Sequence, residues 1–227
     1  MHWIDPDSLL ELQGTVERFV LNPHGEIDGF VMLGGEEDAT VLVHTPPHME
    51  AELMRHVKTG ESVRVQGLRP RGATLFAAVA VAAQSGVRIV DEGPDDEREH
   101  PKFEKKKMTA VGQVRLSLFG PKGELRGALL TDGTVIRIGP KEAKELAELL
   151  KPNAAITVSG DGIETSHGRV IHAKEAGSEI GRLLPIKEAK PKEKHEREKH
   201  KEKHEKHGHG PKHRPKHEHE DGREAHA

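Results

Sequence analysis

The chain of 227 residues contains no cysteine and no tyrosine, and it has one tryptophan and five phenylalanines. Without cysteine it forms no disulfide, iron–sulfur cluster or cysteine-ligated zinc site, and it has no thiol nucleophile. The longest uninterrupted apolar run, residues 75–83, is far shorter than the ~20 residues of a membrane helix. The first residues lack the basic and apolar regions of a signal peptide, so we expect a cytoplasmic protein with no membrane partner.

Charge is unevenly distributed along the chain. Residues 1–94 carry 7 basic and 14 acidic side chains, residues 108–186 carry 10 and 9, and residues 187–227 carry 13 and 10. The last segment has no aromatic residue, leucine, valine, isoleucine or methionine, so it cannot bury enough apolar surface to fold alone. We therefore predict a first domain over 1–90, a charged linker over 91–107, a second domain over 108–186 and a disordered tail over 187–227.

The two predicted domains are copies of one unit. Gly14-Thr-Val16 aligns with Gly112-Gln-Val114, and the stretch 22–29 aligns with 120–127, both at an offset of 98 residues. Further along, the offset drops to 93, where 63–67 aligns with 156–160. Because loops tolerate deletions, this drift predicts a shorter loop in the second copy.

Each copy predicts the same order of elements: a strand, a Pro/Gly turn, two more strands, a helix and a final strand pair. In the first helix Thr45 can act as the cap, and Met49, Leu53 and Val57 share one face. After the turn, the predicted strands are 27–33, 40–44, 62–68 and 73–82 in the first copy, and 125–130, 135–138, 155–160 and 169–174 in the second.

This order resembles the OB-fold, and the tandem arrangement resembles bacterial proteins with two OB-like units. The expected fold class is all-β with short helices: two tandem OB-fold-like five-stranded barrels plus a disordered His-rich tail. The resemblance implies oligonucleotide binding on strands 2 and 3, framed by the loops joining strands 1–2 and 4–5.

The predicted framing loops are 22–29 and 69–72 in the first copy, and 120–127 and 161–168 in the second. Their basic residues are candidates for contact with phosphate oxygens: His24, Arg69, Arg71, Lys122 and Arg126. The alternative is that the glycines and prolines serve turn geometry and the arginines are merely solvated. The acidic first copy and the few aromatics predict weak binding, with Phe30 and Phe76 in the core.

No motif of a known catalytic site occurs in the sequence, so we expect a protein that is not an enzyme. His44, His48 and His56 flank or lie in the first helix and form a weak candidate metal set.

The tail carries nine of the 17 histidines in a Lys/Glu-rich matrix. It resembles the His-rich C-termini of nickel-handling accessory proteins, such as urease accessory proteins and a nickel-linked prolyl isomerase, although it lacks the cysteines of the latter. Imidazole suits nickel and zinc, so divalent metal binding is expected, with a merely solubilising tail as the alternative. The candidate ligands are His195, His200, His204, His207, His209, His213, His217 and His219.

Three readings of the function follow. The first is a non-enzymatic OB-fold protein that binds single-stranded nucleic acid weakly and carries a metal-binding tail. The alternative is a nickel or zinc buffering protein or metallochaperone whose barrels dock a protein partner, and a pure scaffold is the third reading. No cofactor is expected to be obligatory.

Overall fold

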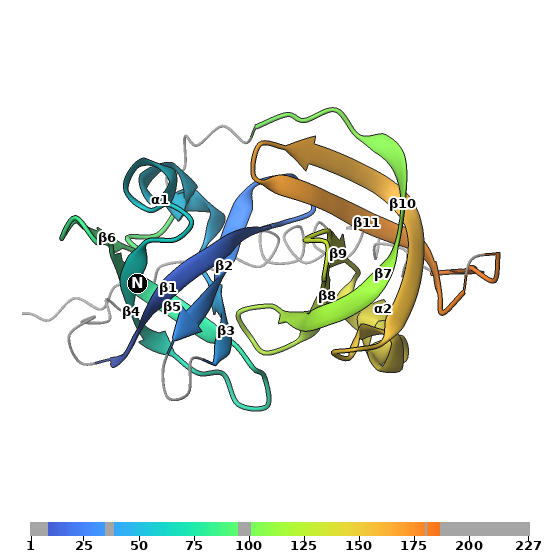
Figure 1. The fold of residues 1–227 in the computed structure, drawn as a ribbon, viewed down its shortest axis with the longest axis horizontal. Helices are drawn as coiled ribbons and strands as arrows, with labels where there is room; N and C mark the ends of the chain where they lie inside the picture. The colour runs from blue at the N-terminus through green and yellow to red at the C-terminus, as the bar shows by residue number, and fades with distance from the viewer. Residues whose placement is uncertain (1–8, 35–38, 95–100, 180, 187–227) are drawn as a thin grey trace, which may run out of the picture. The chain divides into compact units, whose positions relative to one another are not determined.

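The computed structural model describes residues 9–34, 39–94, 101–179 and 181–186. These residues form two closed five-stranded barrels with a few short helices, so the predicted fold class is confirmed (Figure 1). The first barrel consists of β1 (Leu10–Leu21), β2 (Ile27–Gly34), β3 (Thr40–His44), β4 (Ser62–Leu68) and β5 (Phe76–Ala82). The second consists of β7 (Lys106–Phe119), β8 (Leu125–Leu130), β9 (Val135–Arg137), β10 (Ala155–Thr165) and β11 (Gly168–Gly177).

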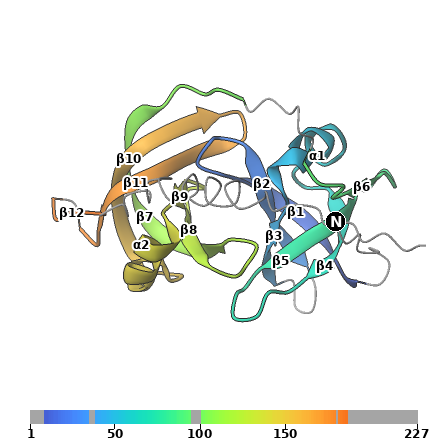
Figure 2. The ribbon, with the colours of Figure 1, turned by 180° about the vertical axis from the view of Figure 1, so that it is seen from behind.

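Both barrels have the same topology. The first sheet has the order β3-β2-β1-β4-β5 and closes through the parallel pair β3–β5. The second has the order β10-β7-β8-β9-β11 and closes through the antiparallel pair β10–β11, with β9 and β11 parallel. Two short strands that the sequence did not predict, β6 (Arg88–Val90) and β12 (Leu184–Pro185), add to β5 and β11 (Figure 2).

A helical segment follows the third strand of each barrel, as predicted. In the first it is a 3₁₀ turn, η3 (Pro47–Met49), leading into α1 (Glu50–His56), and in the second α2 (Pro140–Glu145) is followed by η4 (Ala147–Leu150). Met49, Leu53 and Val57 are all buried, which confirms the predicted apolar face. The prediction that Thr45 caps the helix was wrong, because Pro46 occupies the N-cap and the Thr45 backbone N–H instead donates to Asp28 O.

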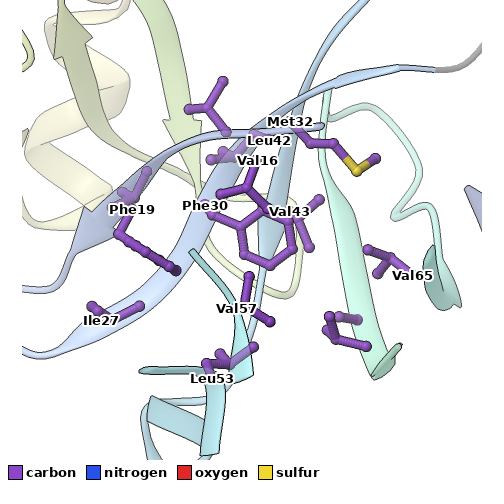
Figure 3. Close-up of a cluster of buried hydrophobic side chains, with 14 of the residues drawn as sticks. Val16, Phe19, Ile27, Phe30, Met32, Leu42, Val43, Leu53, Val57 and Val65 are labelled. Atoms are coloured by element: carbon purple, nitrogen blue, oxygen red, sulfur yellow. The ribbon is translucent and has the colours of Figure 1, made fainter. Parts of the chain in front are cut away.

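Each barrel is filled by its inward-facing side chains. The fully buried Phe30 ring lies among Val16, Val43 and Val57 in the first barrel (Figure 3). Phe76 is fully buried as well, so the prediction that these two phenylalanines belong to the core is confirmed.

The predicted loop at 161–168 is instead mostly strand. β10 continues to Thr165 and β11 begins at Gly168, leaving only Ser166 and His167 at the turn. Glycine and aspartate are poor strand formers, which is why this stretch predicted a loop. Gly160 lets β10 lie close to the backbone of β11, because a Cβ atom at this position would lie 2.0 Å from His172 O.

Both barrels fall within one compact unit. The apolar cluster of the first barrel continues into Leu118, Leu129, Val135, Ile163 and Val170 of the second. The remaining apolar residues of the second barrel form a separate cluster around Leu130, Ile136 and Ile156. The two barrels therefore share part of their buried surface.

Candidate nucleic-acid interface

The loops between the first two strands of each barrel are tight turns built in the same way. Gly25 and Gly123 both have positive φ angles, +84° and +81°, which glycine adopts without strain. In the first loop the Asn22 side-chain oxygen accepts hydrogen bonds from the backbone N–H groups of His24 and Glu26, at 2.8 and 3.1 Å. The shared Asn/Gly–Pro–x–Gly–Glu pattern thus serves turn geometry, and the exposed position between Pro and Gly is His24 or Lys122.

Three of the five predicted phosphate-contact residues lie on two loops that meet, and a fourth, Arg126, lies on β8 directly after the second loop. A Cβ atom on Gly123 would lie 3.4 Å from Arg71 O and 3.5 Å from Pro70 Cβ. The loop of Arg69 and Arg71 in the first barrel therefore packs against the loop of Lys122, which leads into Arg126 on β8 of the second. We call Arg69, Arg71, Lys122 and Arg126 the loop cluster; the first three are exposed and the Arg126 side chain is 42% exposed.

One carboxylate lies within the loop cluster. Glu124 accepts hydrogen bonds from Arg126 Nη2 and Nε, at 2.6 and 3.1 Å, and from the Lys122 backbone N–H at 3.1 Å. Burial alone would raise the pKa of the Glu124 carboxyl, but these hydrogen bonds and the Arg126 charge hold the pKa below its usual value. Glu124 is therefore ionised at neutral pH, and it fixes Arg126 while cancelling one of the four positive charges.

His24, the fifth predicted contact, lies elsewhere. Its neighbour Gly25 packs against Phe103 and Ile163, whose side-chain atoms would lie 2.7 and 3.0 Å from a Cβ atom there. Among the described residues, no hydrogen bond or ion pair joins His24 to the loop cluster. Phe103, 40% exposed, is the large aromatic side chain beside it.

The strand 2–3 surface of the first barrel, which the OB resemblance implies for ligand binding, is partly covered by the second barrel. Arg137 of β9 donates from Nη2 to Asp28 Oδ1 at 2.6 Å and from Nε to Leu21 O at 2.8 Å. Burial raises the pKa of Asp28 despite this ion pair, and burial lowers the pKa of the nearby His44. Because Arg137 occupies part of this strand 2–3 surface, a nucleic acid does not have the whole of the surface available.

The histidines of the first barrel do not gather into a metal site. His48 Nε2 lies 2.7 Å from Asp91 Oδ1, whereas His56 Nε2 lies 3.6 Å from Glu52 Oε2. Within the described part of the chain, no group of three or more histidine or carboxylate side chains is placed to hold a metal ion. The eight candidate ligands of the tail, His195 to His219, lie outside the described residues.

Sequence reasoning missed Arg115 and Arg137, which join the two barrels, because a cation on a strand is usually solvated. It also missed the cleft that lies between the barrels beside Phe19.

No helix of the described residues is long and apolar enough to span a membrane.

Comparison with known proteins gives neither a matching family model nor a matching curated protein. Among solved structures, the wild-type single-stranded DNA binding protein from Thermus aquaticus is similar, at 12% identity and a TM-score of 0.23, over 80% of this chain and 94% of that one. A deletion mutant of the same protein aligns at 13% identity and a TM-score of 0.23, over 81% and 96%. Because the sequence identity and the TM-score are this low, any functional inference rests on the residues of this chain alone.

Proposed function

We propose that the chain is a non-enzymatic binding protein whose loop cluster contacts the phosphates of single-stranded nucleic acid. The observation that carries the proposal is the meeting of the two basic loops at Gly123 and Arg71. Guanidinium groups suit phosphate oxygens, and three of the four cations are exposed. A single strand crossing these loops would contact both barrels at once.

The proposed binding is weak and dominated by phosphate contacts. Phe30 and Phe76 are buried, so they offer no ring to a base, and the first 94 residues carry twice as many acidic as basic side chains. Each stacked base contributes ~1–3 kcal/mol, and a chain with few exposed rings forgoes most of it. We therefore expect little sequence preference and a strong dependence on salt.

The test compares Arg69→Ala/Arg71→Ala with the control Arg55→Ala/Arg64→Ala, which removes two exposed arginines outside the loop cluster. Loss of two phosphate contacts should weaken binding to oligo-dT. It should also make the negative slope of log affinity against log salt shallower by about 1.4. The control should leave both unchanged. If a chain ending after Ile186 shows no binding at about 50 mM salt, the barrels do not bind nucleic acid.

A second candidate function concerns the tail. We propose that its histidines bind nickel or zinc, as the ligand preference of imidazole supports. In the metallochaperone alternative the barrels dock a protein partner instead of a nucleic acid. The two functions are separable, because the loop-cluster variant leaves every tail histidine in place.

A further inference from the structure

A cleft of about 770 Å³ lies between the two barrels, and its lining shares no residue with the loop cluster. Its volume is typical of small-molecule sites, which often occur at domain interfaces. The first barrel contributes 17–19 of β1, Met54 of α1 and residues 57–59 after that helix. The second contributes the turn 132–134 and the β10–β11 turn with its flanking residues, 164–169.

The carboxylates nearest to the cleft's arginines are already engaged. Glu17 accepts a bidentate pair of hydrogen bonds from Arg115, and it lies 3.8 Å from Arg18 Nε. Asp132 Oδ2 accepts from Arg169 Nη2 at 3.1 Å and from the Thr134 hydroxyl at 2.9 Å. Arg18 therefore shares the Glu17 carboxylate with Arg115, whereas the Lys58 ammonium has no carboxylate within ion-pair distance among the described residues.

Arg18 reaches across to the second barrel. A Cβ atom on Gly133 would lie 1.8 Å from Arg18 Nη1, so the guanidinium packs directly against this turn, where the φ angle of +90° favours glycine. The buried Arg18 Nε has no hydrogen-bond partner among the described residues. The Arg18 side chain as a whole is 35% exposed, so its guanidinium can donate to an anion that enters the cleft.

An aromatic surface and a carboxylate also line the cleft. The exposed His167 ring contacts Phe19 edge to face, with centroids 6.1 Å apart. Phe19 in turn contacts Phe30 edge to face, at 6.5 Å, which anchors the pair in the core. Glu164, exposed on the same β10–β11 hairpin, can accept a hydrogen bond from an amine.

We propose that this cleft binds a nucleoside monophosphate. The phosphate contacts Arg18 and Lys58, the base lies against His167, and an exocyclic amine of the base donates to Glu164. Hydroxyl groups of Thr59, Thr165 and Ser166 line the cleft where the ribose would lie. The proposal does not depend on nucleic-acid binding at the loop cluster.

The test is calorimetric titration of the full chain with AMP, ribose 5-phosphate and inorganic phosphate. We expect AMP to bind with a dissociation constant below about 1 mM, roughly tenfold tighter than ribose 5-phosphate. Lys58→Gln should weaken binding of AMP and ribose 5-phosphate alike by about tenfold, since both lose a phosphate contact. His167→Ala should abolish the preference for AMP over ribose 5-phosphate.

Lys144→Gln on α2 removes the same charge from an exposed position outside the cleft, so it should leave every affinity unchanged. The proposal is overturned if AMP binds no tighter than inorganic phosphate, or if Lys58→Gln has no larger effect than Lys144→Gln. Oligo-dT binding by the Lys58→Gln variant should stay at the parental level, which separates this site from the loop cluster.

Discussion

Glu17 of β1 and Arg115 of β7 occupy equivalent positions in the two repeats, 98 residues apart, and form a bidentate ion pair with each other. The hydrogen bonds from Arg115 lower the pKa of Glu17, and the same bonds raise the pKa of Arg115. Equivalent residues contact each other across an interface only where a two-fold axis passes near them. The pair therefore indicates that the barrels associate as the two halves of a pseudo-symmetric dimer.

The strand 1–2 loops show the same reciprocity. Gly25 in the first barrel contacts Ile163 on the strand 4–5 hairpin of the second. Its equivalent Gly123 in the second barrel contacts Pro70 and Arg71 in the strand 4–5 loop of the first. Each barrel thus places its strand 1–2 loop on the strand 4–5 connection of the other, as in an isologous interface.

Reversing the charge of one partner should destabilise the protein. Glu17→Arg places two guanidinium groups face to face, and Arg115→Glu places two carboxylates face to face. We expect each variant to lose about 1–3 kcal/mol of unfolding free energy, measured in urea, and the double variant to recover most of it. Arg182→Glu, at an exposed position outside the interface, is the matched control. A double variant as unstable as the sum of the singles would show that the pair contributes nothing specific.

The separate barrels should fold but should be less stable than the intact chain. Residues 1–94 contain every strand of the first sheet, and residues 108–186 contain every strand of the second except the first two residues of β7, so each fragment can bury a core. Cutting between them exposes the apolar residues that the two barrels share, including Leu118 and Ile163. We expect both fragments to melt cooperatively below the melting temperature of the full chain and to associate when mixed.

Sedimentation of the mixed fragments measures this association. Glu17→Arg in the first fragment should weaken it, because the ion pair with Arg115 is replaced by repulsion. Fragments that remain monomeric when mixed, and melt as the full chain does, would show that the linker alone holds the barrels together.

Much of the fold could be predicted because the repeat supplied two independent examples of each element. The third strand of the first barrel, Thr40–His44, was predicted to the residue, since strand and turn residues alternate clearly there. The β10–β11 hairpin was misjudged because its glycines weaken the strand pattern while allowing close packing. The composition of residues 69–72 and 120–127 identified basic loops, but their meeting depends on how the barrels pack.

Packing between barrels depends on the shapes and charges of two whole surfaces, so no local pattern predicts it. The opposite charges of Glu17 and Arg115 at an offset of 98 residues were visible in the sequence. The two charges indicate a contact between Glu17 and Arg115 only once the two barrels are known to be related by a two-fold axis. The cleft beside Phe19 was hidden for the same reason, since its lining comes from four separate segments.

His44 should make the stability of the protein depend on pH. Burial lowers its pKa, the Asp28 and Glu124 charges oppose this, and Arg137 adds to it, so the folded value lies below the ordinary ~6.5. Above about pH 6.5 the imidazole is neutral in both states and stability is complete. Below it the unfolded chain takes up a proton that the folded chain resists, so stability falls until the folded pKa is reached.

Urea unfolding of His44→Leu between about pH 6.5 and 5.5 should show a smaller loss of stability than the parent shows. Asp28 faces His44 with a pKa raised by burial, which acts in the opposite sense, so the difference between variant and parent is the quantity to measure. Equal slopes for parent and His44→Leu would show that His44 does not cause the dependence.

The tail should bind metal ions in a pH-dependent way. Neutral imidazole is the ligand form, and an unperturbed histidine has a pKa of about 6.5, so affinity should decline as pH falls through that range. Nickel or zinc titrations of the full chain and of residues 1–186, at pH values of about 7.5 and 5.5, separate the two parts of the chain. We expect the full chain to bind ions at the higher pH and to lose most of them at the lower. Because the described barrels bring no three metal-ligating side chains together, residues 1–186 should take up few ions at either pH. Equal uptake by the two chains would assign the ions to the barrels and leave the tail histidines without a metal role.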